Sequence, residues 1–193
     1  MKRLAVFASG NGSNAEAITR HLEASTHAVE LIVSNNPKAG VLKRARLLGV
    51  KQVVFEQKGK AAGRYLVHQL EMHGIDAIAL AGYLKLIPVD ILNAYSERVW
   101  NIHPALLPMY GGKGMYGDRI HKRVLQDQVN RTGITIHQVN EEYDKGKILF
   151  QASFPVEKDW KLEELTDRIH RLEHMYYPRV LNLLLDELDD QER

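Results

Sequence analysis

The chain has 193 residues, of which 45% are hydrophobic and 26% charged, and its net charge is +2. This size and composition are typical of one globular domain with a buried core, and so small a net charge provides no general attraction for nucleic acid or an anionic membrane. The lack of cysteine excludes disulfides, thiolate nucleophiles and cysteine-ligated zinc. Because no apolar run approaches the roughly 20 residues of a spanning helix, we expect a cytoplasmic protein.

Short apolar segments alternate with helical patterns along the chain. Strands are predicted at residues 3–8, 29–34, 52–55, 75–81, 98–102, 133–139 and 148–154. Helices are predicted at residues 15–22, 42–48, 60–73, 89–94, 118–126 and 162–185. Strands joined by helices need crossover connections, so we predict an α/β fold with a Rossmann-like, mainly parallel, twisted sheet flanked by helices. We assign residues 1–185 to a single domain and residues 186–193 to an acidic tail that frays.

A glycine-rich loop, Ser9-Gly10-Asn11-Gly12-Ser13-Asn14, separates the first strand from the first helix. Glycines allow a sharp turn close to a ligand, and free amides at a helix start attract anions. We therefore predict that Gly12, Ser13 and Asn14 bind a phosphate or carboxylate, against the alternative of a plain capped turn. The loop also fits the dinucleotide pattern of an NAD(P)-dependent oxidoreductase. That pattern needs an acid after the second strand, which ends instead in Ser34-Asn35-Asn36, so a single phosphate is preferred.

Asn101 and His103 lie two residues apart at the end of a predicted strand and should face the same way. An amide donor beside an imidazole suits a reaction in which negative charge develops on an oxygen. Asp144, in a turn between two later strands, would raise the His103 pKa if the two were close. A cap, a bend and a turn would explain the three residues equally well one by one. The loop at 103–117 is longer than a plain connection requires, and such loops often carry function.

The segment Asn101-Ile102-His103-Pro104-Ala105-Leu106-Leu107-Pro108 resembles the N-I-H-P-S-L-L-P signature of the formyltetrahydrofolate-dependent formyltransferases, with Ala105 in place of serine. Segments 9–14, 80–87 and 172–174 resemble those of family members that act on glycinamide ribonucleotide, in the same order and over nearly the whole chain. Two features depart from the pattern. The loop at 110–117 is longer and richer in glycine, and an arginine common near residue 60 is replaced by Lys58 or Lys60.

The resemblance implies that the enzyme transfers the formyl group of 10-formyltetrahydrofolate, as co-substrate, to the amine of glycinamide ribonucleotide in purine biosynthesis, without a metal. Asn101 and protonated His103 would stabilise the oxyanion intermediate, while Asp144 raises the His103 pKa and orders a proton-relaying water. The expected binding residues are, for the ribonucleotide, Gly12, Ser13, Asn14 and Glu173, and, for the folate, Leu84, Lys85, Leu86, Ile87 and Asn101. Partners are then small molecules alone, and the protein could be a monomer or a homodimer.

Other interpretations make different demands on the chain. A formyltetrahydrofolate hydrolase (deformylase) of this family would carry an additional N-terminal domain, and an enzyme formylating initiator tRNA an additional C-terminal one. A folate- or nucleotide-sensing module would not need Asn101, His103 and Asp144 together. The run from His170 to His174 matches the zinc-peptidase pattern H-x-x-E-H, but few residues remain downstream for a third ligand.

Overall fold

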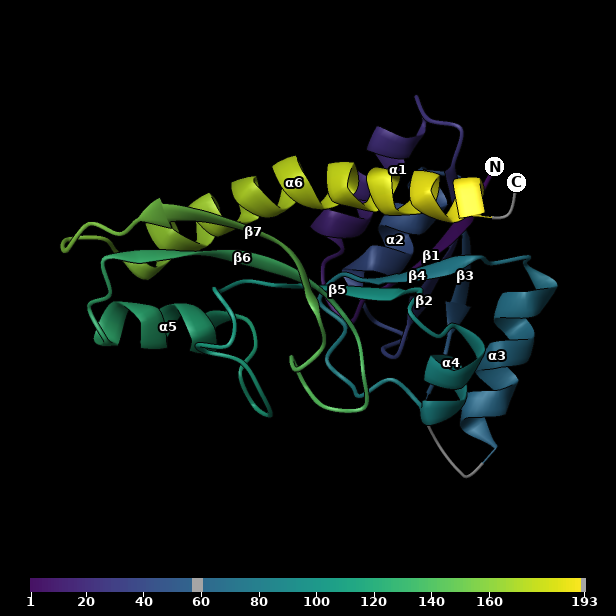
Figure 1. Ribbon diagram of the computed structural model, residues 1–193, viewed down its shortest axis with the longest axis horizontal. Coiled ribbons are helices and arrows are strands. Elements are labelled where there is room, and N and C mark those ends of the chain that lie inside the picture. The colour runs from purple at the N-terminus through teal and green to yellow at the C-terminus, as the bar shows by residue number, and fades with distance from the viewer. Residues whose placement is uncertain (57–60, 192–193) are drawn as a thin grey trace.

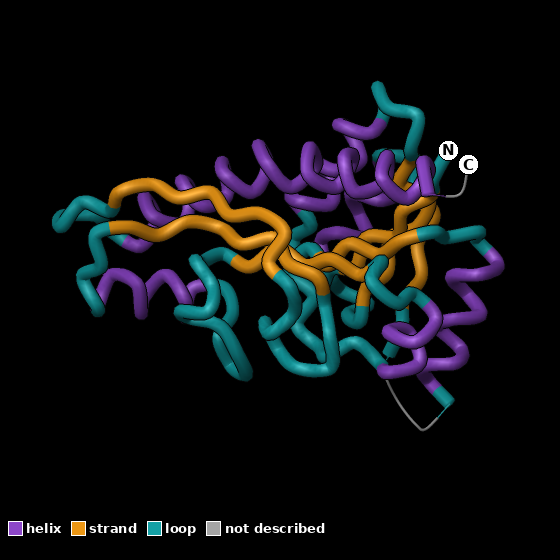
Figure 2. Tube along the Cα trace, in the orientation of Figure 1, coloured by secondary structure: helices purple, strands orange, loops and turns teal. Residues whose placement is uncertain are grey.

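The computed structural model describes residues 1–56 and 61–191, and its centre is one twisted sheet (Figures 1 and 2). In the described residues the strands are β1 (Arg3–Phe7), β2 (Ala28–Ser34), β3 (Lys51–Val54), β4 (Ala77–Leu80), β5 (Val99–His103), β6 (Arg131–Gln138) and β7 (Ile148–Pro155). Their order across the sheet is β3-β2-β1-β4-β5-β6-β7. The strands from β3 to β5 are parallel, whereas β6 and β7 run antiparallel to their neighbours. The predicted α/β fold with a mainly parallel sheet is confirmed.

Helices cover both faces of the sheet. They are α1 (Ser13–Leu22), α2 (Gly40–Leu47), α3 (Ala62–Met72), α4 (Val89–Ala94), α5 (Asp118–Gln126) and α6 (Leu162–Gln191). Buried residues of α1, α2, α5 and α6 form one hydrophobic cluster, and those of α3 and α4 form a second. Figure 1 shows α1 and α6 on one side of the central strands and α3 and α4 on the other. Every side chain of the central parallel strands is therefore available for burial.

Strand β4 shows how side-chain size sets the distance between layers. Ala77 and Ala79 face the cluster that includes α6, whereas Ile78 and Leu80 face the cluster that includes α3 and α4. Small side chains on the first face allow α6 to lie close to the sheet. The buried hydroxyl of Tyr177 in α6 reaches the backbone carbonyl oxygens of Leu80 and Trp100, at 3.1 and 3.0 Å. The long helix is thereby fixed over the ends of β4 and β5.

The end of α6 differs from the prediction. The helix continues past Leu185 to Gln191, so the expected fraying from Asp186 is wrong for these residues. Asp186 accepts a hydrogen bond from Nε2 of the buried His27 at 2.9 Å, and the N-terminal ammonium lies 3.0 Å from Asp189 Oδ1. Contacts with the start of the chain therefore help to stabilise the acidic last turns of α6.

Two further expectations concern membrane-spanning helices and the lysines proposed to contact the folate. Among the described helices, none combines the length and the apolar character needed to cross a bilayer. Lys58 and Lys60, the two candidates for folate contact, lie outside the described residues.

Candidate active site

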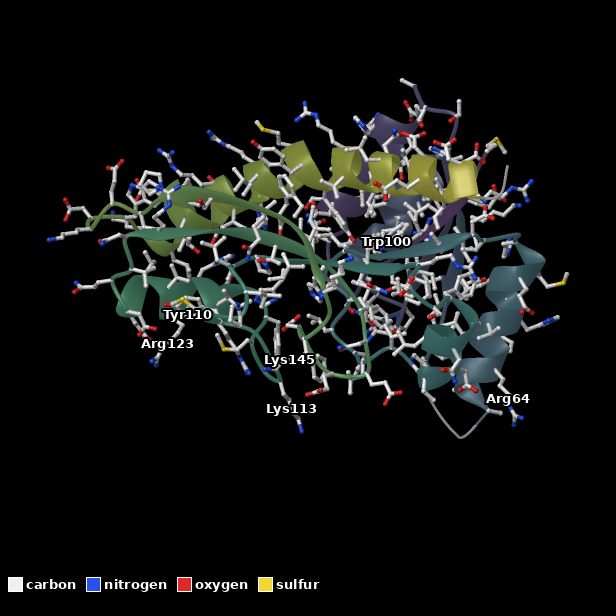
Figure 3. The ribbon with its side chains drawn as sticks, in the orientation of Figure 1. Arg64, Trp100, Tyr110, Lys113, Arg123 and Lys145 are labelled. Atoms are coloured by element: carbon white, nitrogen blue, oxygen red, sulfur yellow. The ribbon has the colours of Figure 1, made fainter. Side chains whose placement is uncertain are left out.

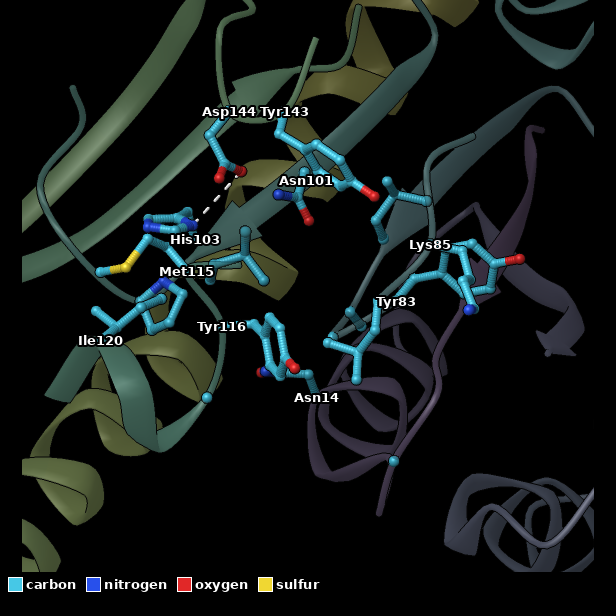
Figure 4. A pocket seen from close by; sticks show the side chains of 18 of the residues that line it. Asn14, Tyr83, Lys85, Asn101, His103, Met115, Tyr116, Ile120, Tyr143 and Asp144 are labelled. Atoms are coloured by element: carbon cyan, nitrogen blue, oxygen red, sulfur yellow. Dashed lines mark ion pairs between the residues drawn. The ribbon is translucent and has the colours of Figure 1, made fainter. Parts of the chain in front are cut away.

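A cavity of about 690 Å³ opens where β1, β4 and β5 end. Its lining includes the glycine loop, residues 80–87, the end of β5, most of residues 112–121 and 137–144, and His170 and Glu173 of α6. Figure 4 shows Asn101, His103 and Asp144 gathered on one side of the opening, with Asn14 and Tyr116 on another. The predicted catalytic and binding residues that the structure describes therefore all line one cavity.

The antiparallel pairing of β5 with β6 positions the two functional residues of β5. Asn101 lies opposite His137, and His103 lies opposite Thr135. The Asn101 Nδ2 atom is 3.1 Å from His137 Nε2, and the His137 Nδ1 atom donates to the Gln138 carbonyl at 2.8 Å. Because Nδ1 carries the hydrogen, the lone pair of Nε2 accepts one amide hydrogen of Asn101. The second hydrogen of that amide is left available for a ligand in the cavity.

Asp144 lies beside His103, as the family resemblance implied. Asp144 Oδ1 is 3.5 Å from His103 Nδ1, and Oδ2 accepts the backbone N–H of Gly112 at 2.9 Å (Figure 4). Asp144 has a left-handed backbone, with φ at 57°, a conformation that aspartate tolerates better than most residues. A β-carbon on Gly111 would lie 2.6 Å from a Leu107 methyl and 3.2 Å from the Asp144 β-carbon. The missing side chain at 111 thus allows the loop to close on the carboxylate.

The charge of Asp144 is maintained despite its burial. Burial alone would raise the pKa of this carboxyl. The nearby rings of His103 and His137, whose Nε2 lies 3.6 Å from Asp144 Oδ1, with a smaller effect of the Gly112 N–H, outweigh burial and hold the pKa well below its ordinary value. On the other side of the ring, His103 Nε2 donates to the Tyr110 carbonyl oxygen at 2.9 Å. Both nitrogens of this buried imidazole therefore face oxygen acceptors.

The glycine loop lies beside a buried acid at the same cavity. Gly12 precedes α1 with φ at 80°, and no side chain caps the helix start. Asn14 Nδ2 donates to Glu173 Oε2 at 2.9 Å, while the buried Asn14 Oδ1 has no protein partner. Burial raises the pKa of Glu173, against the opposing effect of the Asn14 amide. The loop and the acid together offer free amides, an acceptor and a titratable carboxyl to a ligand.

The segment after β4 forms another wall. Ile87 is buried, whereas Leu84, Lys85 and Leu86 are exposed at the cavity. The Leu84 N–H donates to Ser9 Oγ at 2.9 Å, which connects this wall to the glycine loop. The backbone is thus held in place while apolar side chains remain open to a ligand.

Comparison with known proteins decides the family. A family model described as Formyl transferase matches residues 2–181. The chain belongs to the formyl transferase family. It is 40% identical to the phosphoribosylglycinamide formyltransferase of Bacillus subtilis, over 96% of this chain and 95% of the relative. It is 43% identical to the chloroplastic enzyme of that name from Arabidopsis thaliana over 96% of this chain, but spans only 66% of that relative.

Solved structures support the same assignment. Glycinamide ribonucleotide transformylase 1 of Geobacillus kaustophilus superposes with a TM-score of 0.88 at 39% identity, covering 96% of this chain and 99% of that one. Phosphoribosylglycinamide formyltransferase of Bacillus halodurans superposes with a TM-score of 0.87 at 36% identity, covering 95% of each. The fold of this chain therefore matches the folds of these relatives along almost its whole length.

The sequence analysis did not identify two residues of this site. Thr135 and His137 are buried on β6, and each faces a residue of β5. Thr135 Oγ1 donates to the Ala105 carbonyl at 2.7 Å and accepts the Leu107 N–H at 3.0 Å. The loop after His103 is fixed through backbone atoms, so this bond does not depend on the side chain at 105. Thr135 and His137 alternate with Ile134 and Ile136, and this alternation was the sequence signal that could have identified them.

His121 of α5 is a further residue that the sequence analysis did not single out. Its ring lines the cavity and is buried, and Nδ1 has no protein partner. Burial, with a smaller effect of His170, lowers its pKa to about 4, so the ring is neutral near pH 7.

The loop that contains Tyr110 is attached to the end of α5. Tyr110 and Arg123 both donate to Asp127 Oδ2, at 3.1 and 3.0 Å (Figure 3).

The residues of α6 that match the zinc-peptidase pattern are not arranged as a metal site. The rings of His170 and His174 stack nearly parallel, with centroids 6.2 Å apart. Within residues 1–56 and 61–191, no three His, Cys, Asp or Glu side chains are grouped as a metal site would need. Glu173 of this pattern points instead to Asn14 at the cavity.

Proposed function

We propose that the protein transfers the formyl group of 10-formyltetrahydrofolate to the amine of glycinamide ribonucleotide, a step of purine biosynthesis. The convergence of Asn101, His103 and Asp144 beside an uncapped helix start in one cavity carries this proposal. Family membership and the names of the relatives support the choice of reaction and substrate. No metal ion is required by the chemistry.

The reaction begins with attack of the substrate amine on the formyl carbon, which forms a carbon–nitrogen bond and a tetrahedral oxyanion. The free amide hydrogen of Asn101 and the His103 ring stabilise this oxygen. For His103 Nε2 to reach it, the oxyanion replaces the Tyr110 carbonyl as the acceptor. The bond between the formyl carbon and N10 of the folate then breaks. A water held by Asp144 carries the proton from the amine to N10, so that atoms and charge balance.

The two substrates occupy different walls of the cavity. Amides and side chains of Gly12, Ser13 and Asn14 bind the phosphate at the start of α1. Glu173 accepts hydrogen bonds from the glycinamide or ribose end, which gives this buried carboxyl a further partner beside Asn14. Residues 84–87 hold the pterin through backbone groups and apolar contacts, and Asn101 contacts the formyl group. This arrangement places the amine between the phosphate loop and the folate.

The test is a direct assay. Purified protein is mixed with 10-formyltetrahydrofolate and glycinamide ribonucleotide, and the release of tetrahydrofolate is followed by absorbance. We expect turnover that requires both compounds. Release from the folate alone, unaffected by the ribonucleotide, would replace the transferase by a hydrolase. Variants of Ser13 and Asn14 should weaken ribonucleotide binding and leave folate affinity unchanged, and the reverse result would exchange the two binding sites.

A further inference from the structure

The N-terminus of α2 lies directly against the glycine loop. The Val41 N–H donates to the Gly10 carbonyl at 3.1 Å, and a β-carbon on Gly12 would be only 2.4 Å from a Val41 methyl carbon. Gly12, whose φ is +80°, is therefore required both by its backbone conformation and by this contact. The conformation of the loop depends on α2 as well as on α1, which follows it.

Arg44, one turn further along α2, holds the same loop with two donors. Its Nε donates to the Asn11 carbonyl oxygen at 2.9 Å, and its Nη2 donates to Asn11 Oδ1 at 3.2 Å. Its Nη1 forms an ion pair with Glu16 of α1. The planar guanidinium thus joins α2, the loop and α1 with all three of its nitrogens. A lysine could supply the charge but not this set of directions.

These contacts set the orientation of two successive peptide groups. In a trans peptide the C=O and the following N–H point in opposite directions. The Gly10 carbonyl is fixed by Val41, so the Asn11 N–H points away from α2. The Asn11 carbonyl is fixed by Arg44, so the Gly12 N–H also points away from α2. Oriented amides of this kind bind anions without reorganising.

We propose that Arg44 is a positioning residue for the substrate phosphate, which acts through Asn11 and does not touch the ligand. This inference rests on the proposed function, because it requires an anion at the glycine loop. Without Arg44 the Asn11–Gly12 peptide can rotate, and binding then has to restrict it. The penalty falls on the phosphorylated end of the substrate alone, since the residues that contact the folate and the formyl carbon do not bond to Arg44.

The experiment compares Arg44→Met with Arg20→Met, assayed with the ribonucleotide and with the same compound lacking its phosphate. Arg20 is the matched control, because its Nε and Nη2 donate to Glu16 at 3.0 and 2.9 Å. Arg44→Met should raise KM for the ribonucleotide about 10-fold or more, in line with the cost of misplacing a binding group. We expect kcat, KM for the folate, and kcat/KM for the dephosphorylated compound to change less than about twofold, since they do not depend on the phosphate.

Two further results separate the possible failures. Arg44→Lys should recover only part of the lost affinity, because a single ammonium nitrogen cannot reproduce the fixed directions in which the three guanidinium nitrogens donate. Equal losses with the phosphorylated and dephosphorylated compounds, or no loss with either, would overturn the role of Arg44. If the unmodified protein itself fails to prefer the phosphorylated compound, the phosphate site of the proposed function is at fault instead.

Discussion

Asp144→Asn tests the centre of the proposed mechanism. The substitution removes a charge and keeps the shape, so an acceptor for the Gly112 N–H is retained. The carboxylate oxygen lies 3.5 Å from His103 Nδ1, and the Asp144 side chain is 11% exposed. At an effective dielectric constant of about 20, opposite unit charges at this separation attract by about 5 kcal/mol. If screening at the cavity mouth removes about half, a loss of about 2.5 kcal/mol corresponds to about a 70-fold lower kcat.

The pH profile makes this prediction more specific. The pKa of Asp144 is held below its ordinary value, so its contribution to stability is present above about pH 4 and is lost as the pH falls further. Asp144→Asn lacks that acid-side loss. The melting temperature of the variant should therefore fall less than that of the unmodified protein as the pH drops below about 4.

The measurement is steady-state turnover between pH 5 and pH 9, with thermal unfolding to show that the variant is folded. Glu141→Gln removes an exposed acid from the same segment and serves as the control. A kcat within about threefold of the unmodified protein, from folded Asp144→Asn, would refute the mechanism.

Three other predictions follow from buried polar groups. Glu173→Gln should raise KM for the ribonucleotide and also raise the melting temperature at pH 8. The pKa of Glu173 is raised, so the unmodified protein loses stability as the pH rises through that value and the carboxyl becomes charged, whereas the glutamine variant does not. Equal melting temperatures of the two proteins at pH 8 would contradict this reasoning. His121→Phe should remove a loss of about 3 kcal/mol that the unmodified protein shows between pH 6.5 and pH 4, measured by urea unfolding; an unchanged loss would assign it to other groups. Tyr177→Phe should lower the free energy of unfolding by about 1–3 kcal/mol, since two buried carbonyls lose their donor, and a neutral effect would show that water replaces it.

Local patterns were sufficient for the elements and for part of the site. Strands such as β1 and β4 are short apolar runs between turn residues, and their burial on both faces follows from that composition. Gly49 and Gly74 lie just past the C-caps of α2 and α3 with positive φ, a position at which glycine commonly ends a helix. Asn101 and His103 could be placed together because their spacing on one strand is a local property.

Contacts between distant segments decided the rest. The approach of Asp144 to His103 depends on the antiparallel return of β6 and on the loop that Gly111 allows to close, and the family resemblance predicted it where spacing could not. His137 was missed because its role comes from a partner 36 residues away on the neighbouring strand. The last turns of α6 form because His27 and the N-terminal ammonium supply partners for acids that would otherwise repel one another. Periodicity describes only a residue's own element, whereas charge pairing and burial depend on which elements the fold brings together.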